Sequence, residues 1–316
     1  MISLTDRIKS RAIELGFCRV GIARATGLDE EGKLLREWLS RNYHGSMDWM
    51  ARNSEKRVDP RKLLPNAQSV VAVAMNYYTE EEQSSESDVG KISRYAWGDD
   101  YHDIMTPRLE KLLEYVKHEV PTGSGKVYVD TGPVMDKVWA ARAGIGWEGK
   151  HTNVISREFG SWIFLGEVIL DIGLEYDEPA VDYCGTCTRC IDACPTQAIV
   201  EPYVLDSNLC ISYLTIEHKG EIPATLASKF GNWIYGCDIC QDVCPWNQKF
   251  SNPTAEVAFS PRDGNLSPQL SELAEMTEDR FREHFQGSPV KRTKHAGLLR
   301  NINAVRKNKE LIVEKD

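Results

Sequence analysis

The feature that most constrains this chain is the spacing of its cysteines, because eight of the nine lie between residues 184 and 244. They form two runs, and each run ends in Cys-Pro. The first run has the C-x2-C-x2-C-x3-C-P spacing of bacterial ferredoxins, and its cysteines are Cys184, Cys187, Cys190 and Cys194. The second repeats this spacing with Ile234 at its first position, and its cysteines are Cys237, Cys240 and Cys244.

The second run lacks one thiolate, and Cys210 is the remaining cysteine of this region. In two-cluster ferredoxins the three closely spaced cysteines bind one cubane, whereas the cysteine before proline binds the other. We therefore expect one 4Fe-4S cluster on Cys184, Cys187, Cys190 and Cys244. We expect a second cluster on Cys194, Cys210, Cys237 and Cys240.

Zinc sites and disulfides are the competing interpretations of these cysteines. Two zinc sites would also use eight thiolates, but zinc ribbons pair two C-x2-C knuckles and need neither a third cysteine nor the prolines. Disulfides require an oxidising compartment, and residues 1–17 are rich in charge with no apolar core of a secretion signal. We expect a cytoplasmic iron-sulfur protein.

The remaining sequence predicts a fold much larger than a ferredoxin. At 316 residues and 41% hydrophobic, the chain can bury one large core plus a small appended domain. No apolar stretch approaches the roughly 20 residues of a membrane span. Hydrophobic periodicity predicts helices at 4–15, 30–40 and 101–119, a helix between Pro133 and Gly144, and strands at 17–22, 69–77, 126–130, 153–156 and 162–170.

These elements predict an α+β protein in three parts. Residues 1–180 form a domain around a central mixed sheet, residues 181–250 form a ferredoxin-like two-cluster domain, and residues 251–316 form a short helical C-terminal segment. Gly144-x-Gly146-x-x-Gly149 matches a dinucleotide fingerprint, but it follows a helix and precedes a strand. Because that order is the reverse of the Rossmann arrangement, we expect only a tight turn there.

The charge distribution suggests a contact with nucleic acid despite a net charge of −9. Between residues 286 and 309 there are seven lysines or arginines and no acidic residue. Such a cationic tail on an acidic protein is suited to phosphate contacts, because neutralising phosphates releases counterions. An exposed, solvated helix face is the alternative explanation.

Several motifs outside the cysteine spacing recur in a known family. They are EKRV (55–58), RYAWGDDYH (94–102), VDTGP (129–133), AGIGWEGK (143–150), CGTC (184–187), CISYLT (210–215) and YGCDICQ (235–241). Their identity and order resemble the tRNA epoxyqueuosine reductase family over roughly residues 1–250, with a weaker match in 291–305.

This resemblance implies a cobalamin-dependent enzyme that reduces epoxyqueuosine to queuosine at the wobble position of tRNA. It implies a nitroreductase-like cobalamin-binding first domain, in which the clusters pass single electrons to cobalt and generate Co(I). Opening an epoxide to an alkene and water also takes two protons. Asp130, after a predicted strand, matches the family's proposed proton donor, and burial beside the corrin would raise its pKa to suit that role. The alternative is that Asp130 only caps the following turn.

Further residues are assigned by the resemblance alone. Besides Asp130, those matching cobalamin contacts are Arg57, Ser93, Lys150, Leu165, Ser212, Gly236 and Cys237. Those expected near the substrate are Asp100, His102, Lys291, Arg292, Lys294 and Arg300, of which the last four would contact phosphates of the anticodon stem-loop. The expected partners are a queuosine-type tRNA and a flavodoxin- or ferredoxin-like electron donor, with the chain a monomer.

Two other function classes share part of this pattern. A corrinoid reductive dehalogenase would use the same cofactors, but members of that group carry a twin-arginine export signal, which we do not expect here. A non-catalytic electron carrier of the ferredoxin type would explain the cysteines. It would leave Asp130, the glycine turn and the basic tail without a role.

Overall fold

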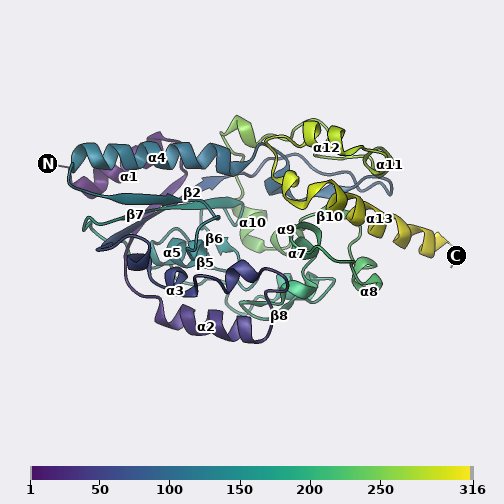
Figure 1. Ribbon diagram of the computed structural model, residues 1–316, viewed down its shortest axis with the longest axis horizontal. Coiled ribbons are helices and arrows are strands. Elements are labelled where there is room, and N and C mark those ends of the chain that lie inside the picture. Colours follow the sequence, from purple (N-terminus) through teal and green to yellow (C-terminus); the bar gives the residue numbers. More distant parts are fainter. Residues whose placement is uncertain (1, 314–316) are drawn as a thin grey trace.

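A four-stranded sheet lies at the centre of the N-terminal part of the molecule (Figure 1). The computed structural model describes residues 2–313, with side chains described through residue 307. The strand order is β1-β2-β7-β4, with bounds β1 Arg19–Arg24, β2 Ser69–Asn76, β7 Ile163–Leu170 and β4 Gly125–Tyr128. The strands lie within three residues of their predicted positions, and the α+β class is confirmed.

The sheet is antiparallel at each of its three pairings, so the expectation of a mixed sheet was wrong. Parallel neighbours require long crossover connections, but apolar strand patterns in the sequence do not reveal strand direction. The two central strands, β2 and β7, are covered on both faces. Their alternating side chains therefore enter two different apolar layers.

Helices α1 (Leu4–Glu14) and α4 (Tyr101–Glu119) cover one face of the sheet (Figure 1). The bounds of α4 are those predicted from its periodicity. Its N-cap is Asp100, whose carboxylate accepts a hydrogen bond from the backbone N–H of His102 at 3.1 Å. This cap directs the start of α4 toward the end of the sheet where Asp130 lies.

The opposite face packs against α5 (Asp136–Arg142), with α2 (Asp29–Ser40) and α3 (Ser54–Arg57) outside it. After α5 the chain turns at Gly144, whose φ is +74°, and enters the hairpin of β5 (Trp147–Glu148) and β6 (Val154–Ile155). The glycine motif at 144–149 is therefore a helix-to-strand turn, as predicted.

The cysteine-rich segment is built from short elements with little core of their own. Its elements are α6 (Arg189–Ala193), β8 (Ile199–Glu201), β9 (Val204–Leu205), α7 (Ile211–Ile216), α8 (Ala224–Ala227), β10 (Trp233–Tyr235), α9 (Ile239–Asp242) and α10 (Pro245–Phe250). β10 pairs in parallel with β3 (Lys91–Ile92), a strand of the first 180 residues.

A buried amide network also attaches this segment to the region beside β7. Gln241 Nε2 donates to the hydroxyl of Ser161 at 3.0 Å and lies 3.1 Å from the Ser161 carbonyl oxygen. Asn247 Oδ1 accepts from the Ser161 N–H at 2.6 Å, and Asn247 Nδ2 donates to the Gln241 carbonyl at 2.8 Å. These three side chains are buried, so their hydrogen bonds hold α9 and α10 against the start of β7.

The C-terminal part is helical, as predicted, and packs on the cysteine-rich segment. Its helices are α11 (Leu270–Ala274), α12 (Glu278–His284) and α13 (Lys294–Val313), and short 3-10 turns lie at 48–50, 60–62, 94–96, 207–209, 257–259 and 289–293. Phe281, Leu298 and Ile302 share one buried apolar cluster with Ile92 and Ile234. In the described part of the chain, no helix is long and apolar enough to cross a membrane.

Candidate functional site: a cavity between the cysteines and Asp130

The cysteines approach one another in the two predicted groups. Burial, and after it the neighbouring thiols of Cys184 and Cys244, raises the pKa of Cys190 to about 11. Burial raises the pKa of Cys244 most, and the negative charges of the nearby Cys184 and Cys187 thiolates raise it further.

The other group consists of Cys194, Cys210, Cys237 and Cys240, each of which is partly exposed. Burial raises the pKa of Cys210, and the charge of the neighbouring Cys194 thiolate adds to the increase. Burial likewise raises the pKa of Cys240 and Cys237, and the charge of the nearby Cys210 thiolate raises both further. The charge of Cys190, in the first group, also raises the pKa of Cys240, so the two groups lie next to each other. Among the described residues, no three His, Cys, Asp or Glu side chains are close enough to hold a single metal ion.

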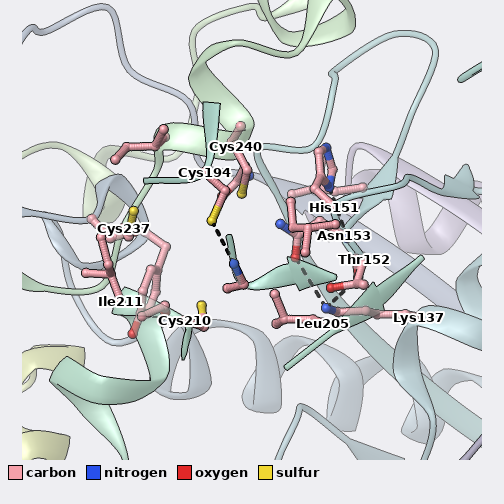
Figure 2. Close-up of a pocket in the computed structure, with 18 of the residues that line it drawn as sticks. Lys137, His151, Thr152, Asn153, Cys194, Leu205, Cys210, Ile211, Cys237 and Cys240 are labelled. Atoms are coloured by element: carbon pink, nitrogen blue, oxygen red, sulfur yellow. Dashed lines mark hydrogen bonds between the residues drawn. The ribbon is translucent and has the colours of Figure 1, made fainter. Parts of the chain in front are cut away.

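A cavity of about 420 Å³ adjoins the second group. Figure 2 shows Cys194, Cys210, Cys237 and Cys240 on one side of it and polar side chains on the other. Of the predicted site residues outside the cysteines, those that line the cavity are Ser93, Asp130, Leu165 and Ser212. Those that do not line it are Arg57, Lys150, Gly236, Asp100, His102, Lys291, Arg292, Lys294 and Arg300.

Asp130 lies just after β4, and its backbone has a left-handed φ of +58°. Tyr101, at the start of α4, donates its hydroxyl hydrogen to Asp130 Oδ2 at 2.8 Å. The Asp130 side chain is 68% exposed, so the chain alone does not provide the burial that we expected for it. Its carboxylate faces the cavity from the rim.

A chain of charged groups leads away from Asp130. His102 Nε2 is 3.9 Å from Asp130 Oδ2, and His102 Nδ1 is 2.8 Å from Asp100 Oδ1. Lys291 Nζ lies 2.9 Å from the other Asp100 oxygen, Oδ2. Burial by itself would raise the pKa of Asp100, but hydrogen bonds from His102 and Lys291 lower it to about 2. Asp100 is therefore an anion, to which His102 Nδ1 donates.

The opposite wall of the cavity contains polar residues that the motifs did not identify. The Asn153 N–H donates to His151 Nδ1 at 3.2 Å, and burial lowers the pKa of His151 to about 4. The ring is therefore neutral with its proton on Nε2, which is buried and has no partner among the described residues. Lys137 Nζ donates to the Thr152 carbonyl at 2.7 Å beside it.

This wall fits a large ligand edged with amides, such as a corrin. A buried N–H donor without a partner is costly, and His151, whose Nε2 is such a donor, is one of the residues that line the cavity (Figure 2). Asp136 also lines this cavity, and its buried Oδ1 lacks a donor among the described residues. The only sequence signal for this wall was its position directly after the glycine turn.

Ser93 lines the cavity next to the second cysteine group, and Gly236 packs against Ser93 from behind the wall. Gly236 has a φ of +67°, and a Cβ added there would lie 2.4 Å from Ser93 Cβ, so only glycine fits. The Ser93 hydroxyl is bound to the buried carboxylate of Asp238. Gly236 therefore acts through its backbone and its close approach to Ser93.

Arg57 and Lys150 lie behind the cavity wall. Arg57 donates to the carbonyls of Trp49 at 3.2 Å and Val134 at 3.5 Å, and burial lowers its pKa. Lys150 Nζ donates to the carbonyls of Gly185 at 2.7 Å and Cys187 at 3.0 Å. The structure thus brings Lys150 to the first cysteine loop and away from the cavity.

Three basic side chains of the C-terminal tail lie in different environments. Arg292 pairs with Glu217 at 2.8 Å, whereas exposed Lys294 has no ion-pair partner in the described part of the chain. Arg300 donates to the carbonyl oxygens of Leu214, His218 and Gly220. These three hydrogen bonds engage Arg300 in holding the segment after α7, and burial lowers its pKa.

Comparison with known proteins identifies the family of this chain. The family model "Epoxyqueuosine reductase QueG, DUF1730" matches residues 57–131, and the model "4Fe-4S double cluster binding domain" matches residues 183–247. An epoxyqueuosine reductase of Cellulophaga algicola is 50% identical over 299 residues, which cover 95% of this chain and 97% of that protein. The chain belongs to the epoxyqueuosine reductase family. It is an oxidoreductase with a domain of the double 4Fe-4S type.

Other epoxyqueuosine reductases extend this likeness. The Escherichia coli protein is 44% identical over 303 residues, covering 95% of this chain and 79% of that protein. A crystal structure of epoxyqueuosine reductase with an epoxyqueuosine-modified stem loop of tyrosine tRNA superposes with a TM-score of 0.90 at 34% identity. The match covers 96% of this chain and 80% of that one. A structure of the Bacillus subtilis epoxyqueuosine reductase, with its catalytic aspartate loop swung out of the active site, has a TM-score of 0.89 at 33% identity. That match covers 96% of this chain and 80% of the other.

We predict that Cys210→Ser removes about half of the bound iron, because it deletes one of the four thiolates of the second proposed cluster. Iron and acid-labile sulfide per chain, measured after anaerobic purification, check this. Cys18→Ser is the matched control, because the partly buried Cys18 thiol donates to the Ala74 carbonyl at 3.3 Å and lies far from the other cysteines in sequence. Full iron content in Cys210→Ser would contradict the assignment.

Proposed function

We propose that this protein reduces epoxyqueuosine to queuosine in tRNA, with cobalamin in the cavity, two 4Fe-4S clusters on the eight cysteines and Asp130 as proton donor. The observation that carries the proposal is that one cavity is lined both by Asp130 and by the second group of cysteines. A reduction that consumes electrons and protons needs both sources at one place.

The eight cysteines are suited to conduct electrons from the protein surface to the cavity. The first group, with Cys184 and Cys187 partly exposed, would receive electrons from a flavodoxin- or ferredoxin-like donor. The second group, which includes Cys240, adjoins both the first group and the cavity. Electrons would therefore pass through the second cluster last.

The cavity walls support cobalamin as the cofactor. Leu165 supplies an apolar surface, Ser93 contributes a small side chain that is held against Gly236, and His151 offers an N–H donor. Bound cobalamin would supply a low-potential cobalt centre that reduces carbon. Arg57, behind the wall, adds positive charge near Asp130 and Asp136.

Asp130 would protonate the epoxide oxygen from the rim of the cavity. Tyr101 orients its carboxyl group through the 2.8 Å hydrogen bond, and the bound base and cofactor would shield it from water. His102 and Asp100 would return a proton to Asp130, since the His102 ring lies between the two carboxylates. Lys291 keeps Asp100 ionised and so fixes the orientation of His102.

The tRNA would approach over the basic tail, with the modified base unstacked into the cavity. Lys294 is the best candidate for a phosphate contact because it is exposed and unpaired in the described part of the chain. Lys291 and Arg292 would contact phosphate only by sharing their present carboxylate partners, Asp100 and Glu217. Arg300 is better assigned to stabilising the fold.

Asp130→Asn should lower the rate of queuosine formation by about 100-fold or more, because an amide cannot donate the acidic proton. The measurement is nucleoside analysis after anaerobic incubation with cobalamin, a low-potential reductant and epoxyqueuosine-containing tRNA. Asp103→Asn, an exposed change on α4, should keep full activity. An active Asp130→Asn variant contradicts the acid assignment, whereas an inactive wild type contradicts the whole proposed function.

His151→Leu should weaken cobalamin binding by about tenfold, which corresponds to one lost hydrogen bond. The fold should survive, because the substitution removes only the 3.2 Å hydrogen bond from the Asn153 N–H to Nδ1, and Nε2 has no protein partner in the described part of the chain. Titration of the protein with cobalamin, followed by its absorption spectrum, gives the affinity without any turnover. Unchanged affinity would show that His151 does not contact the cofactor.

Lys294→Ala should weaken tRNA binding a few-fold and reduce the salt slope of log K by about one, as expected for a lost phosphate contact. Arg300→Ala should instead lower the melting temperature, because it removes hydrogen bonds to three backbone carbonyls. Stem-loop binding measured at several salt concentrations, together with thermal unfolding, separates the two. An unchanged salt slope in Lys294→Ala would remove this residue from the tRNA surface.

A further inference from the structure

A buried carboxyl group lies beneath the cavity and has no part in the mechanism above. Glu167 is on β7, paired in register with Ala72 of β2 and Tyr128 of β4. Its side chain is fully buried on the face of the sheet that packs against α5, where Leu165 and Ile169 are its neighbours in the alternation. An isolated carboxylate in such an apolar layer would be very costly.

Asp136 is the group that Glu167 meets. It is the first residue of α5, and the two side chains are within hydrogen-bonding reach of each other. Neither Glu167 oxygen receives a hydrogen bond from an N–H or O–H donor of the described residues, and neither does Asp136 Oδ1. Two carboxylates cannot bond to each other unless one of them is protonated.

The charged groups around the pair do not neutralise both members. The positive charge of Arg57 lowers the pKa of Asp136, but its hydrogen bonds go to the carbonyls of Trp49 and Val134. Lys137 directs its amine to the Thr152 carbonyl. Asp130 is the other acidic group near the pair, and when it is ionised it disfavours ionisation of both members.

The location of the proton within the pair follows from burial. Burial first, and then the charge of Asp136, raises the pKa of Glu167 well above its usual range. Burial also raises the pKa of Asp136, but the Arg57 charge opposes this. The shared proton therefore lies on Glu167, which donates it to Asp136.

The pair has a route to the reaction. Asp136 lines the same cavity as Asp130 and Tyr101, whereas Glu167 is behind it and has no contact with the cavity. A proton lost by Asp136 into the cavity can be replaced at once by the proton of Glu167. The pair is therefore placed as a store of one proton at the base of the cavity.

We propose that Asp136 and Glu167 share one proton and supply it as the second proton of epoxide reduction. This rests on the proposed function, in which the low-potential donor provides two electrons. Both C–O bonds of the epoxide break, the two electrons form the C=C bond, and the oxygen leaves as water after taking one proton from Asp130 and one from Asp136. Glu167 reprotonates Asp136, and solvent restores the pair.

The shared proton can be tested without turnover. Infrared difference spectra of wild type against Glu167→Gln at pH 7 should contain the C=O band of a protonated carboxylic acid, which shifts in D2O. Glu148→Gln is the matched control, because Glu148 is another carboxyl group whose pKa is raised by burial, but it lies outside the cavity. Absence of an acid band assigned to Glu167 overturns the shared proton.

The role in proton supply is tested by single-turnover rates across pH, with cobalamin binding and thermal unfolding as checks. Glu167→Gln and Asp136→Asn should slow queuosine formation by about tenfold or more. The wild-type rate should fall at high pH as the pair loses its proton, and this decline should be absent from Glu167→Gln. Wild-type rates and pH profile in both variants overturn the role.

The outcome also separates this proposal from the proposed function. An inactive wild type that retains the acid band of Glu167 overturns the proposed function and, with it, proton supply to the epoxide. An active wild type without the band overturns the proton store alone. Both conclusions require that the control variant Glu148→Gln be as active as the wild type.

Discussion

The parallel pairing of β10 with β3 is the contact on which the arrangement of the site depends. It joins the cysteine-rich segment to the part of the chain that contributes Asp130, and it places Gly236 against Ser93. At the position where the second cysteine run lacks its first cysteine, Ile234 lies in the middle of β10 and is fully buried. Its carbonyl accepts a hydrogen bond from Asn301 Nδ2 of α13 at 2.8 Å. The residue that departs from the ferredoxin pattern therefore attaches the clusters' segment to the rest of the protein.

The cavity is electrostatically divided. At one end are the partly exposed thiols of Cys210, Cys237 and Cys240, and at the other are the carboxyl groups of Asp130 and Asp136. Carboxyl groups that are close together hold protons more readily than isolated ones. Such a division would allow a reaction in the cavity to take electrons from the cysteine end and protons from the carboxyl end.

The sequence predicted most of the elements but not how they meet. Cysteine spacing predicted two groups of four cysteines. The periodicity of residues 101–119 predicted both ends of α4 correctly. Both signals are local in the sequence. The direction of the strands was mispredicted, since an apolar strand has the same pattern in either orientation. Lys150 was expected near the cofactor but is drawn to the carbonyls of Gly185 and Cys187. His151 and Glu167 were missed, because a buried polar residue is informative only once its partners are known.

The buried amides of Gln241 and Asn247, bonded to Ser161, have a mechanical consequence. They fasten the loops that carry Cys240 and Cys244 to the start of a central strand of the sheet, so that under the proposed function these parts would meet a docking tRNA as one unit. The distances for electron tunnelling would then change little when the substrate arrives. The adjustment needed to admit a nucleotide would fall instead on the segment around Asp130, whose left-handed backbone lies outside any strand or helix.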